Sequence, residues 1–226
     1  DGTLSFDPPK DVAEYVVYTA VPAKPVPYSK RPIMGFWSGL KDSKEARFQR
    51  AGKLWKVEDQ RFVHDRPDVV SFVTEPLESD VELAGRITAH LHASTSGTDS
   101  DWVVKLIDVY PESYPAKPEM GGYQLMIADD VLRGKFRNGF EAPEPVNPGE
   151  VNEYEINLRT RNHRFRKGHR IMVQIQSSWF PLIDRNPHKF MNIMKADEDH
   201  YQTARQRIYC SPEHPSHIEF SVKKQQ

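Results

Sequence analysis

The chain contains only one cysteine, Cys210, among its 226 residues, so no disulfide bond can form within it. Its fold must therefore be held by a buried core. The length and the 38% share of hydrophobic residues are sufficient for one large domain. The missing disulfides do not assign a compartment, since exported proteins can also lack them.

Long hydrophobic runs and an excess of one charge are also missing. No run approaches the roughly 20 apolar residues that a membrane-spanning helix needs. The 31 Lys and Arg residues balance 32 Asp and Glu residues, giving a formal net charge of −1. We therefore expect neither a membrane nor a nucleic acid as a partner.

The Gly-x-Ser-x-Gly elbow, which exposes a nucleophilic serine in many hydrolases, is absent. The segment Gly35–Gly39 has its serine, Ser38, one position too late and follows no strong strand. Ser177, Ser178, Asp184 and His169 supply the residue types of a catalytic triad. However, His169 begins a predicted strand and Ser177 follows its end, about 25 Å away at ~3.3 Å per residue. We predict strand-end polar residues here and no catalytic residue in this chain.

Alternation of apolar and polar residues indicates β-structure from residue 54 onward. In Arg86–Ser94 and His169–Gln176 one face is apolar and the other polar. Further strands are predicted at 69–73, 102–110, 123–127, 131–136, 153–158, 205–210 and 217–222, and one short helix at 196–204. Turn residues separate these strands, which favours an all-β sandwich with Greek-key or jelly-roll wiring.

Residues 1–53 differ from the rest because prolines recur along them, at positions 8, 9, 22, 25, 27 and 32. Proline lacks an N–H group and restricts the preceding residue to extended conformations. Only residues 13–20 resemble a strand. We therefore interpret 1–53 as an extended arm and 54–226 as the sandwich domain. Two aromatic residues, Phe36 and Trp37, lie between glycines in the arm, where they either cover the domain's own core or meet a partner domain.

Two acidic residues, Asp99 and Asp101, precede the central predicted strand and are the calcium candidates of this sequence. The alternative is turn chemistry, in which their carboxylates accept hydrogen bonds from nearby backbone amides. Lys105 and Asp108 lie in the same apolar strand, and we expect them to form a buried ion pair.

Nine histidines raise the question of a transition metal. His90 and His92 lie on one face of a predicted strand, and His214 and His217 lie three positions apart. No third ligand follows either pair at a convincing spacing, so we expect surface imidazoles and no cofactor.

A basic run extends from Arg159 to Arg170 without an intervening acidic residue. Only Phe165 in this run offers a ring for base stacking, which argues against nucleic-acid binding. The remaining interpretations are a solvated hairpin and a face that docks on an acidic partner domain.

A long series of motifs, in order, resembles a known family. The motifs are Asp59–Phe62, Arg66–Val69, Thr74–Leu77, Val81–Gly85, Ser94–Trp102, Val104–Pro111, Phe165–Ile171, Ser177–Pro181, Asp184–Pro187 and Pro212–Ile218. This series is similar to the C-terminal domain of the X-prolyl dipeptidyl-peptidase and cocaine-esterase family of serine hydrolases. Within that family the α-amino-acid ester hydrolases and glutaryl-cephalosporin acylases are most alike.

The resemblance implies a galactose-binding-like jelly roll. It also implies a parent enzyme whose Ser-Asp-His triad lies in an earlier α/β-hydrolase domain with a helical cap. None of those catalytic residues maps onto this sequence, which is therefore expected to be inactive alone. The implied partners are the hydrolase and cap domains, with assembly of several copies as a further option. Because many relatives are exported, a periplasmic or secreted location is expected.

Two surfaces are predicted to meet the rest of the parent enzyme or to wall its pocket. One is the arm at Phe36 and Trp37. The other is the loop after strand 169–176, with Trp179, Phe180, Asp184 and Arg185, since interface hot spots favour Trp, Tyr and Arg. In the alternative interpretation, Trp179 and Phe180 close the end of the sandwich.

Two other functions remain open from the sequence. A sandwich of this kind can bind carbohydrate, with Trp37 or Trp179 as the stacking residue, and this idea rests on fold analogy. The domain can also serve only as a structural or oligomerisation module.

Overall fold

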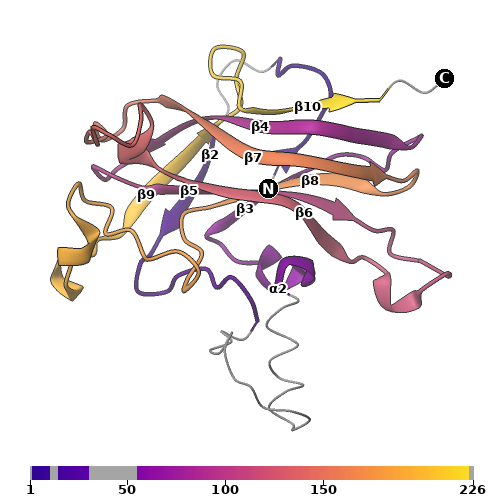
Figure 1. Cartoon of the computed structure of the whole chain (residues 1–226), viewed down its shortest axis with the longest axis horizontal. Helices are drawn as coiled ribbons and strands as arrows, with labels where there is room; N and C mark the ends of the chain where they lie inside the picture. The colour runs from indigo at the N-terminus through magenta and orange to yellow at the C-terminus, as the bar shows by residue number, and fades with distance from the viewer. Residues whose placement is uncertain (1, 11–14, 31–54, 224–226) are drawn as a thin grey trace, which may run out of the picture.

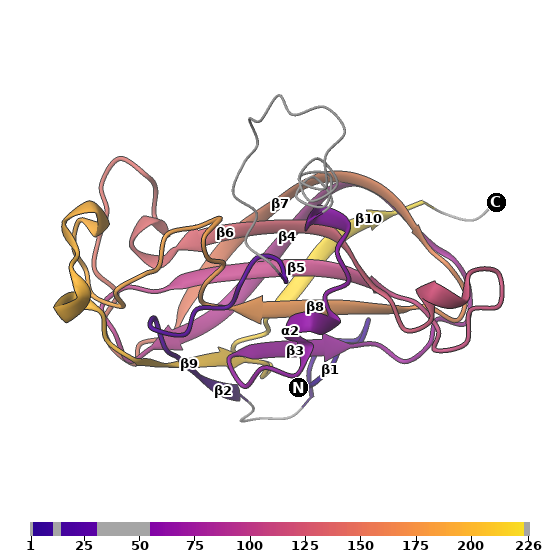
Figure 2. The ribbon, with the colours of Figure 1, turned by 90° about the horizontal axis from the view of Figure 1, so that it is seen from below.

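The computed structural model describes residues 2–10, 15–30 and 55–223, which form two β-sheets packed face to face (Figures 1 and 2). This confirms the predicted all-β sandwich. The jelly-roll wiring stays a prediction. Phe36, Trp37 and Ser38 lie outside the described residues.

The first sheet contains five strands. Neighbouring strands in it run antiparallel, except for β1 and β3, which are parallel. Across the sheet the order is β1 (Gly2–Thr3), β3 (Val69–Val73), β8 (Arg170–Gln176), β5 (Asp101–Val109) and β6 (Gln124–Arg133).

The second sheet is built around the long strand β4 (Val81–Thr95). One side of β4 pairs with β7 (Asn152–Phe165), and its other side pairs with β10 (His217–Val222) and β9 (Ala204–Tyr209). The strand β2 (Tyr15–Ala20) pairs with β9 along its whole length. Residues 15–20 therefore belong to the sandwich, while the division of the chain at residue 53 stays a prediction.

Two local expectations were wrong. The predicted strands 123–127 and 131–136 form one strand, β6, which ends where the short 3-10 helix η3 (Gly134–Phe136) begins. The pairing of β6 with β5 shifts register between Leu106 and Ile107, and β6 continues through this irregularity as one strand. The predicted helix at 196–204 is absent. The segment holds one 3-10 turn, η5 (Glu198–His200), and its last residue begins β9, while a second 3-10 turn, η4 (Ile193–Lys195), precedes it.

Three further short elements were not predicted, namely η1 (Trp55–Val57), α2 (Arg61–His64) and η2 (Pro118–Met120). Of these, α2 lies over the outer face of the first sheet, next to β3 (Figure 2).

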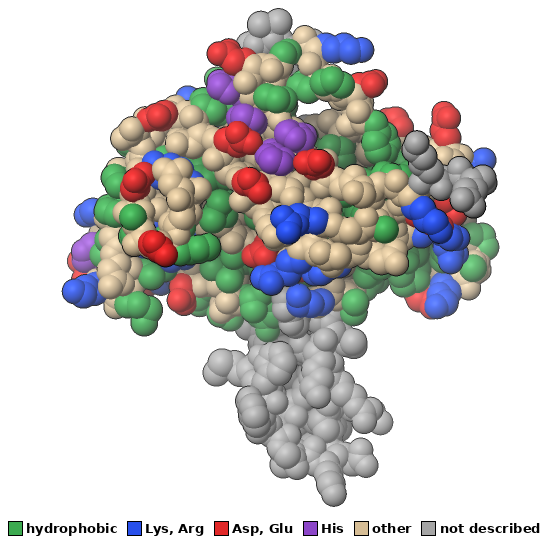
Figure 3. Space-filling view, turned by 45° about the horizontal axis from the view of Figure 1, so that its top comes forward, with side chains coloured by type: hydrophobic (Ala, Val, Ile, Leu, Met, Phe, Trp, Pro, Cys, Tyr) green, Lys and Arg blue, Asp and Glu red, His purple; other side chains and the backbone are tan. Residues whose placement is uncertain are grey.

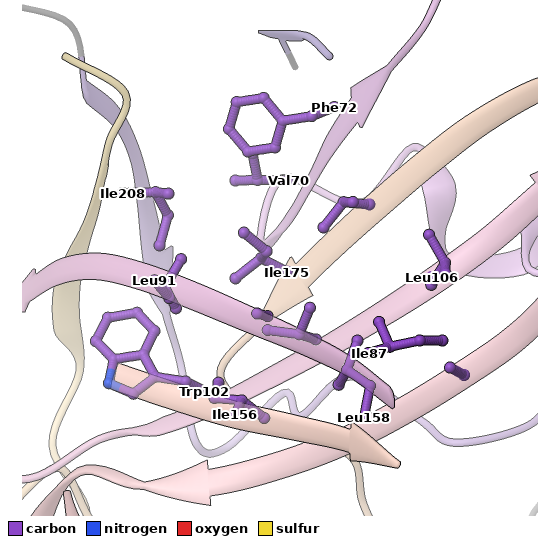
Figure 4. Packing of buried hydrophobic residues seen from close by; sticks show 14 of the residues in the cluster. Val70, Phe72, Ile87, Leu91, Trp102, Leu106, Ile156, Leu158, Ile175 and Ile208 are labelled. Atoms are coloured by element: carbon purple, nitrogen blue, oxygen red, sulfur yellow. The ribbon is translucent and has the colours of Figure 1, made fainter. Parts of the chain in front are cut away.

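The main core lies between the two sheets, where alternate residues of each strand point inward (Figure 4). Trp102 and Leu106 of β5 pack in this cluster with Leu91 of β4 and Ile156 of β7. Burying each such side chain contributes roughly 1.5–3 kcal/mol. The other face of β5 is buried as well, which explains why its sequence is apolar on both faces.

Candidate domain interface

An outer layer of chain covers the far side of the first sheet. Backbone hydrogen bonds tie residues 26–28 to the loop after β8: Tyr28 N–H donates to the Phe180 carbonyl and Phe180 N–H to the Val26 carbonyl, each at 3.0 Å. The Ser178 hydroxyl accepts a hydrogen bond from Val26 N–H at 2.8 Å. The 179–185 loop is therefore held by the protein's own backbone.

The two aromatic residues of this loop have different environments. Trp179 is 3% exposed and packs with Tyr28, Val103 and Met126 in a small second core. Phe180 is 38% exposed, as is Leu182 at 41%. Trp179 therefore closes the outer layer, whereas Phe180 and Leu182 present apolar surface to solvent.

Arg185 is clamped at the edge of this apolar surface. Its Nη2 donates to Glu198 Oε1 at 2.8 Å, and its guanidinium lies 4.4 Å from the ring centre of Tyr201 and 6.0 Å from that of Phe180. The hydrogen bond to Glu198 raises the pKa of Arg185 above its ordinary value. Asp184, one residue earlier, is exposed. The loop thus combines apolar and charged groups, as the cores and rims of interfaces do.

Lys105 lies beneath this layer and is fully buried. Its Nζ donates to Gln60 Oε1 at 3.0 Å and to Gln174 Oε1 at 3.3 Å, and it lies 5.4 Å from the ring centre of Trp179. Burial lowers the pKa of Lys105 to about 7.

The expected ion pair between Lys105 and Asp108 is wrong. Residues three apart on a strand point to opposite faces, so Asp108 lies on the inner side of β5. There its carboxylate binds two imidazoles, His169 Nδ1 at 2.8 Å and His163 Nε2 at 2.9 Å. His163 comes from β7, so this arrangement links the two sheets. The sequence signal for it was a carboxylate in a buried strand, which requires polar partners.

The triad-like residues are not brought together. The hydroxyls of Ser177 and Tyr18 form a hydrogen bond of 2.7 Å. The Ser178 hydroxyl accepts from Val26 N–H, and His169 binds Asp108. These side chains therefore satisfy local structure, as the strand geometry predicts.

The calcium candidates lie close to each other but are used by the protein itself. Asp101 accepts two hydrogen bonds from Arg133 and one from Asn186. The buried carboxylate of Asp99 accepts from the backbone N–H groups of Ser100 and Lys135, both at 2.9 Å. Burial, followed by the nearby Asp101 charge, raises the pKa of Asp99 to about 6. The Arg133 guanidinium thus binds the Asp101 carboxylate, and calcium binding at these two residues stays a prediction of the sequence.

The basic run lies mainly along β7 and the turn into β8, where several of its members have acidic neighbours. Arg159 pairs with Asp130 at 3.1 Å, Arg164 pairs with Glu82, and Arg170 contacts Glu75 at 3.5 Å. These contacts agree with the solvated-hairpin interpretation. Within the described ranges, no helix has the length and apolar character needed to cross a membrane.

Comparison with known proteins gives consistent matches. The family model described as the X-Pro dipeptidyl-peptidase C-terminal non-catalytic domain matches residues 5–219. An aminopeptidase from a marine sediment archaeon, Thaumarchaeota archaeon, superposes with a TM-score of 0.92 at 44% identity, over 99% of this chain and 35% of that one. An α-amino acid ester hydrolase gives a TM-score of 0.90 at 47% identity, over 98% of this chain and 35% of that one.

The cocaine esterase of Rhodococcus sp. (strain MB1 Bresler) is 37% identical over 166 residues, which are 74% of this chain and 27% of the esterase. The chain thus spans about a third or less of the length of these relatives. The match to the family model, which extends over nearly the whole sequence, shows that this chain belongs to the family of X-Pro dipeptidyl-peptidase C-terminal non-catalytic domains.

Proposed function

We propose that this chain is the C-terminal part of a larger serine hydrolase and packs against the α/β-hydrolase and cap domains of that enzyme. The 179–185 loop carries this proposal. Its backbone is anchored to residues 26–28, yet Phe180 and Leu182 expose apolar side chains beside the clamped Arg185. A rigid loop that exposes aromatic and aliphatic groups loses little conformational entropy when a partner covers it.

Two of the solved relatives are named as an aminopeptidase and an α-amino acid ester hydrolase, which supports α-aminoacyl compounds as the substrate class. We infer that the parent enzyme transfers an α-aminoacyl group through an acyl-enzyme on its catalytic serine. In this scheme the present chain supplies no reacting group. It shapes one wall of the acyl pocket and excludes water from it.

The carbohydrate-binding alternative loses one of its two stacking residues. Trp179 is 3% exposed, and an indole buried to this extent cannot stack on a sugar ring. Trp37 lies outside the described residues.

The test starts with the gene product that contains this chain. We expect this product to be several hundred residues longer than the present 226, with an intact mass well above 26.1 kDa and a Gly-x-Ser-x-Gly elbow upstream. The purified 226-residue chain should not hydrolyse p-nitrophenyl esters of amino acids, whereas the whole product should. Ester hydrolysis by the short chain that is lost in Ser38→Ala or Ser177→Ala would refute the proposal. So would a gene that encodes little more than these residues.

A further inference from the structure

Two loops lie next to each other at one end of the sandwich. The loop of residues 138–150 follows η3, and the loop of residues 186–196 contains η4. Both are at the end of the molecule that is on the left in Figures 1 and 2. Thr98 joins the two loops, because its hydroxyl accepts from Phe190 N–H at 2.8 Å and its carbonyl accepts from Val146 N–H at 3.0 Å. They therefore form one continuous surface at this end.

Each loop exposes a large apolar side chain. Phe140 is 77% exposed and Met194 is 82% exposed, and these are the two highest values among the large hydrophobic residues that the structure describes. Phe190, which lies in the same loop as Met194, is 39% exposed. Apolar side chains that gather in this way on a soluble domain are typical of a surface that contacts another protein.

The two loops carry opposite charge. Residues 138–150 contain three glutamates and no Lys or Arg, whereas residues 186–196 contain two lysines and no Asp or Glu. The charged residues are Glu141, Glu144, Glu150, Lys189 and Lys195. His188 adds no charge near pH 7, because burial lowers its pKa to about 4. At the left in Figure 3, hydrophobic side chains are exposed among acidic and basic ones. We call residues 138–150 the acidic loop and residues 186–196 the basic loop.

Most of these charges are not neutralised by the chain itself. Glu144 lies 4.0 Å from Arg137. For Glu141, Lys189 and Lys195, which are all exposed, no ion pair is found in the part of the chain that the structure describes. The surface thus offers an acidic half and a basic half, each with exposed apolar groups. Such a surface is complementary to itself.

We propose that these two loops form an interface between two copies of this chain that are related by a two-fold rotation. The rotation places the acidic loop of each copy on the basic loop of the other. Phe140 then packs against Phe190 and Met194 of the second copy, and Glu141 approaches Lys189 and Lys195. Because the same contact is made twice, the assembly closes at the dimer. The opposite charges favour this register over others.

The experiment is sedimentation equilibrium of the tag-free 226-residue chain at protein concentrations up to about 1 mM. We expect a reversible monomer–dimer equilibrium without larger species. Phe140→Ser and Met194→Ser should each weaken dimerisation roughly tenfold, because each removes an apolar group from the contact. Val222→Ser is the matched control and should not change the equilibrium. Val222 is exposed and pairs with Leu83, whereas the acidic loop contacts Thr95 at the other end of β4.

A pair of charge variants tests the two-fold arrangement. Glu141→Lys places like charges on both sides of each contact, and so does the double variant Lys189→Glu with Lys195→Glu. Each should therefore weaken dimerisation roughly tenfold. In an equimolar mixture both contacts again join opposite charges, so a heterodimer should form with an affinity within about threefold of the parent. Glu78→Lys, at an exposed position before β4, is the control and should leave the equilibrium unchanged.

Three results would overturn the proposal. One is a monomer at every concentration, which would leave these loops to the hydrolase or cap domain of the parent enzyme. Another is a dimer whose affinity is the same in Phe140→Ser as in Val222→Ser. The third is a mixture of the two charge variants that dimerises no more tightly than either one alone. All of the substituted side chains are exposed, so the variants should keep the fold, which circular dichroism verifies.

Discussion

Arg133 and Asp101 form a two-point ion pair, with Arg133 Nε 2.7 Å from Asp101 Oδ1 and Nη2 2.9 Å from Oδ2. The pair joins the start of β5 to the end of β6. The Asp101 side chain is almost completely buried, so its charge depends on this guanidinium and on the amide of Asn186. Breaking such a pair from one side leaves an uncompensated charge in a medium of low polarity.

We predict that Arg133→Met lowers the free energy of unfolding by about 3–5 kcal/mol. Adding Asp101→Asn should recover part of this loss, because the neutral amide no longer needs a counter-ion. Urea unfolding of the two single variants and the double variant gives the coupling energy. Additive effects in this cycle would show that the two side chains do not interact.

Asp99 should respond to pH in the opposite direction from an ordinary carboxylate. Its pKa is about 6 in the folded chain against 3.8 for a free side chain, so the folded state binds the proton more tightly. Stability from this group is complete below pH 4 and is lost as the pH rises through 6. Asp99→Asn keeps the oxygen that accepts from Ser100 and Lys135 and removes the charge.

The Asp99→Asn variant should therefore match the parent near pH 4 and exceed its stability at pH 7.5 by on the order of 2–3 kcal/mol. Denaturant unfolding at the two pH values measures this difference. Asp184→Asn is the control, since Asp184 is exposed. A variant that is less stable than the parent at both pH values would contradict the prediction.

The lowered pKa of Lys105 leads to a second prediction, on how stability depends on pH. Its pKa falls from 10.5 to about 7 on folding, so the unfolded chain binds more protons between these values. The contribution of Lys105 to stability therefore improves as the pH rises from 7 to 10. Lys105→Met lacks this titration, so the stability difference between parent and variant should shift by a few kcal/mol in favour of the parent between pH 7 and 9.5. A difference that does not depend on pH would show that Lys105 titrates normally.

Asp108 should be important for the contact between the sheets. Asp108→Asn replaces one of the two acceptor oxygens with an NH₂ donor, so one imidazole loses its acceptor, and the change should cost about 1.5–3 kcal/mol. His163→Gln, which removes only the partner on β7, should cost less. Thermal unfolding distinguishes the two, and equal losses would place the whole contribution in the His163 contact.

The exposed loop makes a prediction for the full-length gene product. Phe180→Ser should leave the Tm of the 226-residue chain nearly unchanged, because Phe180 is partly exposed there. In the larger hydrolase that we propose, the same change should lower both Tm and kcat/KM for amino-acid esters. Val222→Ser, at an exposed apolar position on β10 of the second sheet, is the control and should affect neither. Equal effects of the two changes would exclude the 179–185 loop as the interface.

Local patterns in the sequence were sufficient for the architecture. Val69–Val73 was predicted with the bounds that β3 has, and most other strands differ only at their ends. Alternation works here because each strand has one face toward a shared core. It failed at 196–204, where the Asp197 carboxylate accepts from Asp199 N–H and stabilises a 3-10 turn, a local competition that composition does not reveal.

The sequence did not indicate which polar side chains of different strands contact each other. The strand period indicates that Lys105 and Asp108, three positions apart, point to opposite faces of the sheet. It does not indicate that Gln60 and Gln174 accept the hydrogen bonds of the Lys105 ammonium group. Nor could the spacing of His90 and His217, which are 127 positions apart, reveal that they stack in register with Glu219 beside them. The sequence by itself determined which faces are buried, because burial follows from side-chain polarity and strand period. Only the tertiary structure decided which polar groups meet, because strand pairing brings together residues that are far apart along the chain.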